Sequence, residues 1–138
     1  MTTKMRWRPT DPASLRRWLL AIVLLAVVVR VGAFTVNHPF PPLAKDDSVY
    51  DALGWNLLNG HGFTASPKPP YEPLVFRTPG YPAFLATIYG VAGHHPDVVR
   101  LVQIVVSLGT LVVVYLLARR LMSTLAALVA AGAFALCP

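Results

Sequence analysis

Three long stretches of the chain are almost free of charged residues, and they limit the possible folds more than any other feature. They run from Trp18 to Phe34, interrupted only by Arg30, from Leu101 to Ala118, and from Leu121 to Pro138. As a helix, each stretch would extend roughly 26 Å, close to the ~30 Å hydrocarbon core of a bilayer. Lipid offers no hydrogen-bond partners to the backbone, and three short segments cannot close a barrel. We therefore expect three transmembrane helices.

The composition supports a membrane protein. Of the 138 residues, 55% are hydrophobic and 13% are charged, whereas about a quarter of the residues of an ordinary soluble domain are charged. The single cysteine, Cys137, excludes an internal disulfide. The basic residues flank the apolar stretches and do not gather with aromatic residues on one polar face, so we expect no nucleic-acid partner.

The distribution of charge predicts both the segments and their orientation. Five basic residues and one acidic residue precede the first stretch, whereas the long loop that follows it carries three basic and five acidic residues. Because basic residues favour the cytoplasmic side, we expect the loop on the outer side of the membrane. The predicted segments are a cytoplasmic basic tail (1–17), a transmembrane helix (18–34), an external loop (35–97), a second transmembrane helix (98–118), a cytoplasmic turn (119–120) and a third transmembrane helix (121–138).

A cleaved signal peptide is the alternative interpretation of the N-terminal segment. A basic region precedes an apolar core, and the pair Arg16 and Arg17 is typical of a twin-arginine signal. Arg30 interrupts the apolar core, however, and no small-residue cleavage site follows it. We therefore favour a retained transmembrane helix.

Two short helices are predicted inside the external loop, near 47–59 and 79–92. The first starts at Asp46-Asp47-Ser48, three residue types that favour a helix N-cap, carries leucines at helical spacing and stops at Asn59 and Gly60. The second begins at Thr78 and Pro79, a pattern typical of a helix start. It is too short to span a bilayer, which indicates an interfacial or re-entrant helix.

The acidic pair Asp46 and Asp47 is the first candidate for chemistry in the loop. Adjacent carboxylates at a membrane surface can accept a proton from a hydroxyl group or hold a divalent cation. The alternative is that both only cap the helix and favour the positive end of its dipole.

Arg77 is the second candidate, because a guanidinium beside a helix start suits a phosphate group. The alternative for Arg77 is contact with lipid headgroups. Interfacial anchoring is the expected role of Arg30 and Arg100, which lie near the outer ends of their helices. The histidines are poor metal ligands, because carboxylate or cysteine partners at suitable spacing are missing.

The order of these blocks resembles the N-terminal part of the GT-C superfamily of polyprenyl-phosphate-dependent membrane glycosyltransferases, which includes the protein O-mannosyltransferase and aminoarabinose transferase groups. Three blocks carry the resemblance. They are Asp46-Asp47-Ser48-Val49-Tyr50, Arg77-Thr78-Pro79-Gly80-Tyr81-Pro82 and Val99-Arg100-Leu101-Val102-Gln103.

The resemblance implies transfer of a sugar from a polyprenyl-phosphate donor to a hydroxyl of a lipid or protein acceptor. It places the catalytic carboxylate on Asp46, a supporting role on Asp47 and contact with the donor phosphate on Arg77. A divalent cation at Asp46 would be compatible with this chemistry.

The length of the chain raises a second hypothesis. Members of the superfamily continue with more transmembrane helices, so we expect an N-terminal fragment, a truncated gene product or a split subunit that is inactive alone. The alternative is a non-catalytic small membrane protein with a structural or assembly role, in which the acidic pair only stabilises a helix.

Overall fold

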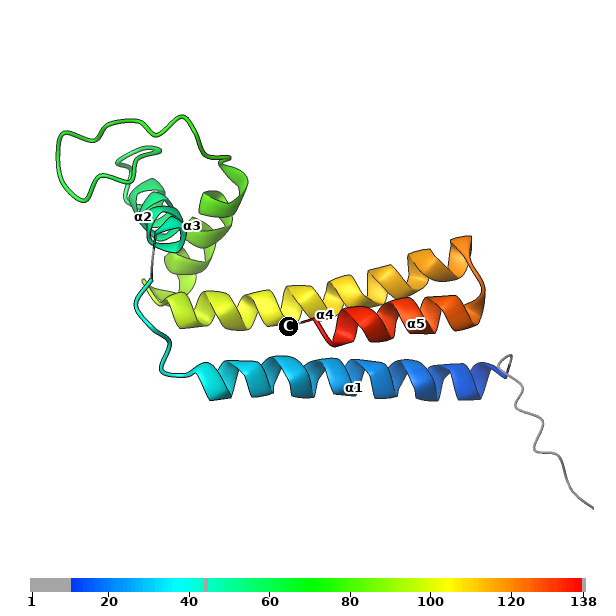
Figure 1. The fold of residues 1–138 in the computed structure, drawn as a ribbon. Coiled ribbons are helices and arrows are strands. Elements are labelled where there is room, and N and C mark those ends of the chain that lie inside the picture. Colours follow the sequence, from blue (N-terminus) through cyan, green and yellow to red (C-terminus); the bar gives the residue numbers. More distant parts are fainter. Residues whose placement is uncertain (1–10, 44, 138) are drawn as a thin grey trace, which may run out of the picture. The chain divides into compact units, whose positions relative to one another are not determined.

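The computed structural model describes residues 11–43 and 45–137. These residues form five α-helices and no strand (Figure 1), which confirms the all-α prediction. The chain divides into two compact units, one built from Met1–His38 with Ile104–Pro138 and the other from Pro39–Gln103. The first ten residues of the predicted basic tail, and Pro138, lie outside the described residues.

Two helices are long and apolar enough to cross a membrane. They are α1 (Pro12–Asn37) and α4 (Pro96–Leu121), each of 26 residues. At 1.5 Å per residue each is about 39 Å long, which exceeds the ~30 Å hydrocarbon core. α1 contains the stretch predicted at 18–34, α4 contains the stretch predicted at 98–118, and each helix extends beyond its predicted stretch. At the start of α1, the Asp11 side chain accepts a hydrogen bond of 3.3 Å from the Ala13 amide, and Pro12 occupies the first turn.

The third predicted transmembrane helix, 121–138, is not confirmed. Its helix, α5 (Thr124–Ala135), has 12 residues, a length of about 18 Å that falls short of the hydrocarbon core. The predicted turn at 119–120 also needs correction, because Arg119 and Arg120 form the last turn of α4. Basic side chains are favourable at that end of a helix dipole. The chain turns after them, and Ser123 caps α5 through the Ala126 amide.

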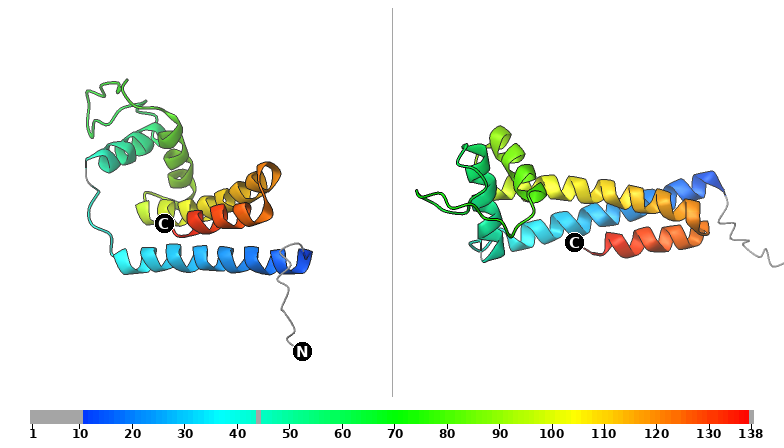
Figure 2. Two further views of the ribbon diagram at one scale, coloured as in Figure 1. Left: turned by 45° about the vertical axis from the view of Figure 1, so that its right-hand side comes forward. Right: turned by 90° about the horizontal axis from the view of Figure 1, so that it is seen from above.

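Small residues let the helices of the first unit pack closely. Ala127, Ala131 and Ala135 recur every fourth residue along α5, so they share one face, and all three are fully buried. They form a core with Ala26 of α1 and with residues of α4, notably Leu111. Figure 2 shows α5 returning antiparallel to the C-terminal part of α4. Small side chains at such contacts allow close approach of helices in lipid.

Arg30 lies inside this unit instead of anchoring α1 at an interface as expected. Its side chain is buried, and its Nε donates to Ser107 Oγ at 2.9 Å. Its two terminal nitrogens donate to carbonyl oxygens of Ala26 in α1 and, at the end of α5, of Phe134, Ala135 and Cys137. The last carbonyls of a helix have no partner within the helix. Arg30 thus supplies donors to the C-terminal end of α5.

The second unit is built on two helices in close contact, α2 (Asp46–Leu58) and α3 (Gly80–Ala92). Their bounds agree with the predicted helices to within one residue. A Cβ atom at Gly54 would lie 2.6 Å from Leu85 Cβ, so only glycine permits this approach. The acidic pair does not cap α2: Lys45 is the N-cap, and Asp46 and Asp47 lie in the first turn.

Replacing Arg30 by lysine should destabilise the first unit. Lysine has three donors and no planar fork, so it cannot serve Ser107 and the α5 carbonyls together. We expect a loss of about 1–3 kcal/mol in the free energy of unfolding, the usual cost of buried polar groups without partners. Denaturation of the chain in detergent micelles, followed by circular dichroism, measures it. Arg16→Lys, at an exposed position of the same helix, is the matched control, and equal stability of both variants would contradict the role of Arg30.

Candidate functional site

Asp46 and Arg77 form an ion pair. Arg77 Nη2 lies 2.5 Å from Asp46 Oδ1, and the guanidinium also lies over the Tyr50 ring, 5.4 Å from its centroid. The structure therefore brings together the predicted catalytic carboxylate and the predicted phosphate-binding cation. The Asp46 side chain is 69% exposed, so this pair contributes little to stability.

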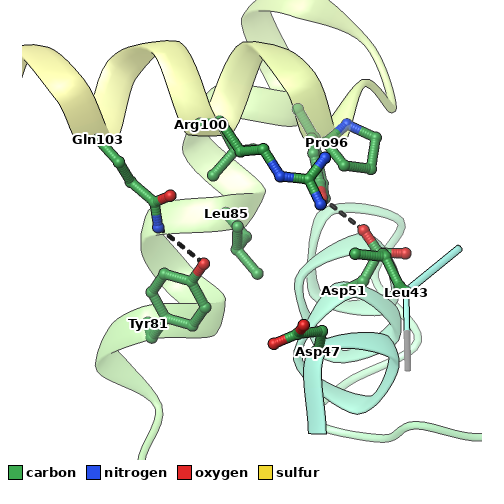
Figure 3. A pocket seen from close by; sticks show the side chains of 10 residues that line it. Leu43, Asp47, Asp51, Tyr81, Leu85, Pro96, Arg100 and Gln103 are labelled. Carbon is green, nitrogen blue, oxygen red and sulfur yellow. Dashed lines mark hydrogen bonds between the residues drawn. The ribbon is translucent and has the colours of Figure 1, made fainter. Parts of the chain in front are cut away.

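A cavity of about 270 Å³ lies in the second unit, between α2, α3 and the first turns of α4. Asp47 and Asp51 of α2 line one side, one helical turn apart, and Tyr81 and Gln103 line another (Figure 3). The apolar part of the wall comes from Leu43, Leu85, Pro96 and Val99. Asp46 and Asp47, predicted to act together, have different contacts: Asp46 pairs with Arg77, whereas Asp47 lines the cavity.

The Asp51 carboxylate contacts two side chains, one from α3 and one from the segment that follows α3. Tyr89 donates its hydroxyl to Asp51 Oδ1 at 2.5 Å, and His94 Nε2 lies 3.0 and 2.9 Å from Asp51 Oδ1 and Oδ2. The His94 ring stacks on Trp55, with 4.5 Å between centroids. Burial, the hydrogen bond to Asp51 and the negative charge of Asp51 all raise the pKa of Tyr89 above its ordinary value. Tyr89 therefore remains a neutral donor to Asp51.

The opposite wall combines a phenol, an amide and a guanidinium. Gln103 Nε2 donates to the Tyr81 hydroxyl at 2.9 Å. Arg100 donates to Asp97 Oδ1 at 2.7 Å and lies over the Phe40 ring, 3.9 Å from its centroid. The expected role of Arg100 was interfacial anchoring, but its side chain is partly buried and lines the cavity.

The described residues do not form a dedicated metal centre. Among them, no group of three or more His, Cys, Asp or Glu side chains is placed to hold a metal ion. Asp46, the carboxylate considered for a divalent cation, is bound to a guanidinium, and a cation would have to displace it. The donor set therefore does not fit a resident metal.

The sequence located part of this arrangement. The helix beginning at Asp46 places Asp47 and Asp51 at i and i+4, which are on one face, so this spacing could have revealed the second cavity carboxylate. Tyr89 and His94 are 38 and 43 residues from Asp51. No local pattern indicates that they meet it, because the contact depends on how α2 and α3 pack.

Comparison with known proteins yields one match. The sequence profile of the family described as dolichyl-phosphate-mannose-protein mannosyltransferase matches residues 76–138. The match begins next to Arg77, includes α3, α4 and α5, and covers less than half of the chain. No curated protein and no solved structure matches the chain significantly. The profile match supports the GT-C resemblance over this part of the chain, without indicating a particular member, and together with the two apolar helices it points to a membrane protein.

Substituting Asp51 by asparagine should bring the pKa of Tyr89 part of the way back toward its ordinary value near 10. Burial remains, so the pKa should stay raised, but the charge and the acceptor carboxylate are lost. Titration of tyrosinate by ultraviolet absorbance in micelles measures the change, and Tyr89→Phe identifies the signal of Tyr89. An unchanged late-titrating tyrosine in the Asp51→Asn variant would contradict the contact.

The raised pKa of Tyr89 predicts that the free energy of unfolding falls at high pH. The folded state favours the neutral phenol, so its contribution to stability is complete below the unfolded pKa and is lost as the pH rises from there through the folded pKa. The wild-type chain should therefore lose more stability in this alkaline range than the Tyr89→Phe variant.

Proposed function

We propose that this chain carries the first external loop of a GT-C-type glycosyltransferase. The enzyme would transfer a sugar from a polyprenyl-phosphate donor to an acceptor hydroxyl at the outer face of a bacterial inner membrane. The pair of Asp46 and Arg77 is the observation that carries this proposal, because it joins an acid–base group to a phosphate-binding cation. The family match over residues 76–138 supports it from the sequence.

In the proposed reaction, the pair separates when the donor binds. The phosphate competes for the Arg77 fork, which suits phosphate oxygens, and the Asp46 carboxylate is released. Asp46 then takes the proton of the acceptor hydroxyl while the hydroxyl oxygen bonds to the anomeric carbon of the sugar. The bond from that carbon to the phosphate oxygen breaks, and its electron pair leaves with the lipid phosphate. Arg77 stabilises the charge that develops there.

The position of the loop suits a lipid donor. The loop is flanked in the chain by α1 and α4, the two helices able to cross a membrane. A polyprenyl tail would remain in the hydrocarbon layer, and its phosphate would reach the aqueous boundary where a partly exposed arginine can meet it. Asp47 would support Asp46 from the next position of the same helical turn.

The second candidate is a non-catalytic membrane protein. One observation favours it: Asp46 and Arg77 bind each other, as they would in a purely structural link between α2 and the segment before α3. In that case the pair needs only opposite charges, and either residue could carry either sign. This difference separates the two functions.

Asp46→Asn should lower sugar transfer by about 10²–10⁴-fold, the usual contribution of a positioned acid–base group. The assay uses membranes that contain the longest reading frame including this chain, a polyprenyl-phosphate-linked sugar and a mixture of lipid and protein acceptors. Glu72→Gln, at an exposed position of the same loop, is the matched control. Full turnover in the Asp46→Asn variant would rule out the catalytic assignment.

Exchanging the two charges sharpens this test. The double variant Asp46→Arg/Arg77→Asp retains an ion pair, so folding should be close to that of the wild type, but transfer should stay lost because the base and the phosphate-binding group are misplaced. If the exchange restores transfer that Asp46→Arg alone abolishes, the pair has a structural role only.

The proposed orientation has its own test. A reporter enzyme that is active only in the periplasm, inserted within residues 60–75, should be active, because the basic residues before α1 favour the cytoplasm. The same reporter inserted before α1 should be inactive. The opposite pattern would place the loop in the cytoplasm and reverse the proposed topology.

A further inference from the structure

The proposed reaction uses Asp46 and Arg77, with Asp47 in support, and gives no role to the other residues of the cavity that Asp47 lines. This cavity is lined by several polar groups that do not belong to the ion pair. They are Asp47, Asp51, Tyr81, Tyr89, Arg100 and Gln103. The best-fixed of them is Asp51, whose side chain is 17% exposed and contacts two partners.

The Asp51 carboxylate is a hydrogen-bond acceptor whose position is fixed by two neighbouring side chains. Tyr89 and His94 occupy part of its hydrogen-bonding capacity, with contacts of 2.5 to 3.0 Å. A carboxylate accepts at about four lone-pair positions, so capacity remains toward the cavity. The stacking of His94 on Trp55 fixes the imidazole plane, and Tyr89 is itself buried. The orientation of the carboxylate is therefore set before any ligand arrives.

The other walls supply complementary groups. Tyr81 accepts a hydrogen bond from Gln103, which leaves its own hydroxyl hydrogen and the Gln103 carbonyl oxygen for a ligand. Asp47 has no side-chain hydrogen bond or ion pair within the described part of the chain, so it adds a further acceptor. Acceptors therefore outnumber donors around the cavity, which suits a ligand that carries several hydroxyl groups.

The charge and the volume of the cavity further restrict the class of ligand that it could bind. The charge of Arg100 is offset by Asp97, and two carboxylates remain on the α2 side, so an anion would be repelled. The volume of about 270 Å³ lies just below the range of about 300–1,000 Å³ that is typical of pockets for drug-sized ligands. The cavity has the size for a small group such as one sugar ring.

We propose that Asp51 is a second functional carboxylate, which binds hydroxyl groups of an uncharged sugar ring in this cavity, and that Tyr89 and His94 are its positioning residues. The identification of the ring as a sugar rests on the proposed glycosyltransferase function. The binding itself requires no transfer, so it is tested separately.

Saturation-transfer NMR of the 138-residue chain in a detergent without sugar groups tests the proposal. The probes are methyl mannopyranoside, which is uncharged, and the methyl glycoside of glucuronic acid, which carries a carboxylate. We expect the mannoside to bind and the glucuronide to bind more weakly. Asp51→Asn should weaken mannoside binding by about tenfold, the effect of losing one hydrogen bond to a charged group, and should reduce the preference for the uncharged probe.

Two conservative variants test the positioning residues. Tyr89→Phe keeps the buried ring, and His94→Gln keeps a polar side chain, but each loses a contact to Asp51. Each should weaken mannoside binding by a few-fold while helical content and melting temperature stay close to wild type. Matched controls are Glu72→Gln for Asp51→Asn and His95→Gln for His94→Gln, because these residues do not line the cavity.

The outcomes are distinct. Absence of mannoside binding in the wild-type chain, or equal binding and equal probe preference in the Asp51→Asn variant, would overturn the proposal. Binding that depends on Asp51, in a protein that transfers no sugar, would instead overturn only the proposed transferase function.

Discussion

The close approach of α2 and α3 at Gly54 is the contact on which the candidate site depends. The missing side chain lets the Leu85 side chain reach the α2 backbone, where a Cβ atom would be only 2.6 Å away. Asp51 lies one turn before Gly54, and Tyr89 lies one turn after Leu85. Because α2 and α3 are so close at this crossing, the short Asp51 side chain reaches both the Tyr89 hydroxyl and the His94 imidazole. A larger residue at Gly54 would separate the groups that shape the cavity.

The first unit contains a buried charged side chain, Arg30, among apolar helices. An unpaired charge is costly in an apolar environment. Arg30 has no acidic partner among the described residues, and carbonyl oxygens and one hydroxyl accept its hydrogen bonds. The end of a helix presents several carbonyls without partners in one direction, together with the negative end of its dipole. The guanidinium and the end of α5 thus satisfy each other.

Local sequence determined more of the second unit than of the first. The helices near 47–59 and 79–92 were predicted to within a residue, because proline, glycine and asparagine mark their ends and such signals act over one turn. The start of α5 at Thr124 could not be predicted from hydropathy, since the apolar stretch begins at Leu121, which belongs to α4. The contact between Arg30 and the Ala135 carbonyl joins residues 105 positions apart, so no local pattern predicts it.

In the candidate site, too, local sequence predicted the residues but not the tertiary contacts that they make. Asp46, Asp47 and Arg77 were identified from residue type and from their place before helices. The local pattern did not predict that Asp46 would meet Arg77 while Asp47 turned to the cavity. Adjacent residues in a helix point about 100° apart, which is why Asp46 and Asp47 have different contacts here. A prediction that treats the acidic pair as a unit therefore misses Asp51, which lies one turn later and lines the same cavity as Asp47.

Asp46, Asp47 and Asp51 consequently occupy three environments within a turn and a half of α2. Asp46 is paired with a guanidinium, Asp51 accepts from a phenol and an imidazole, and Asp47 lines the cavity without a side-chain partner among the described residues. Carboxylates in different environments suit different tasks. An exposed carboxylate held by a displaceable cation suits a proton acceptor that is released when an anion binds. A carboxylate fixed by two neighbours suits the orientation of a ligand, because its position does not change when the ligand arrives. The division of labour proposed for α2 follows from these contacts, since the chemical group is the same at all three positions.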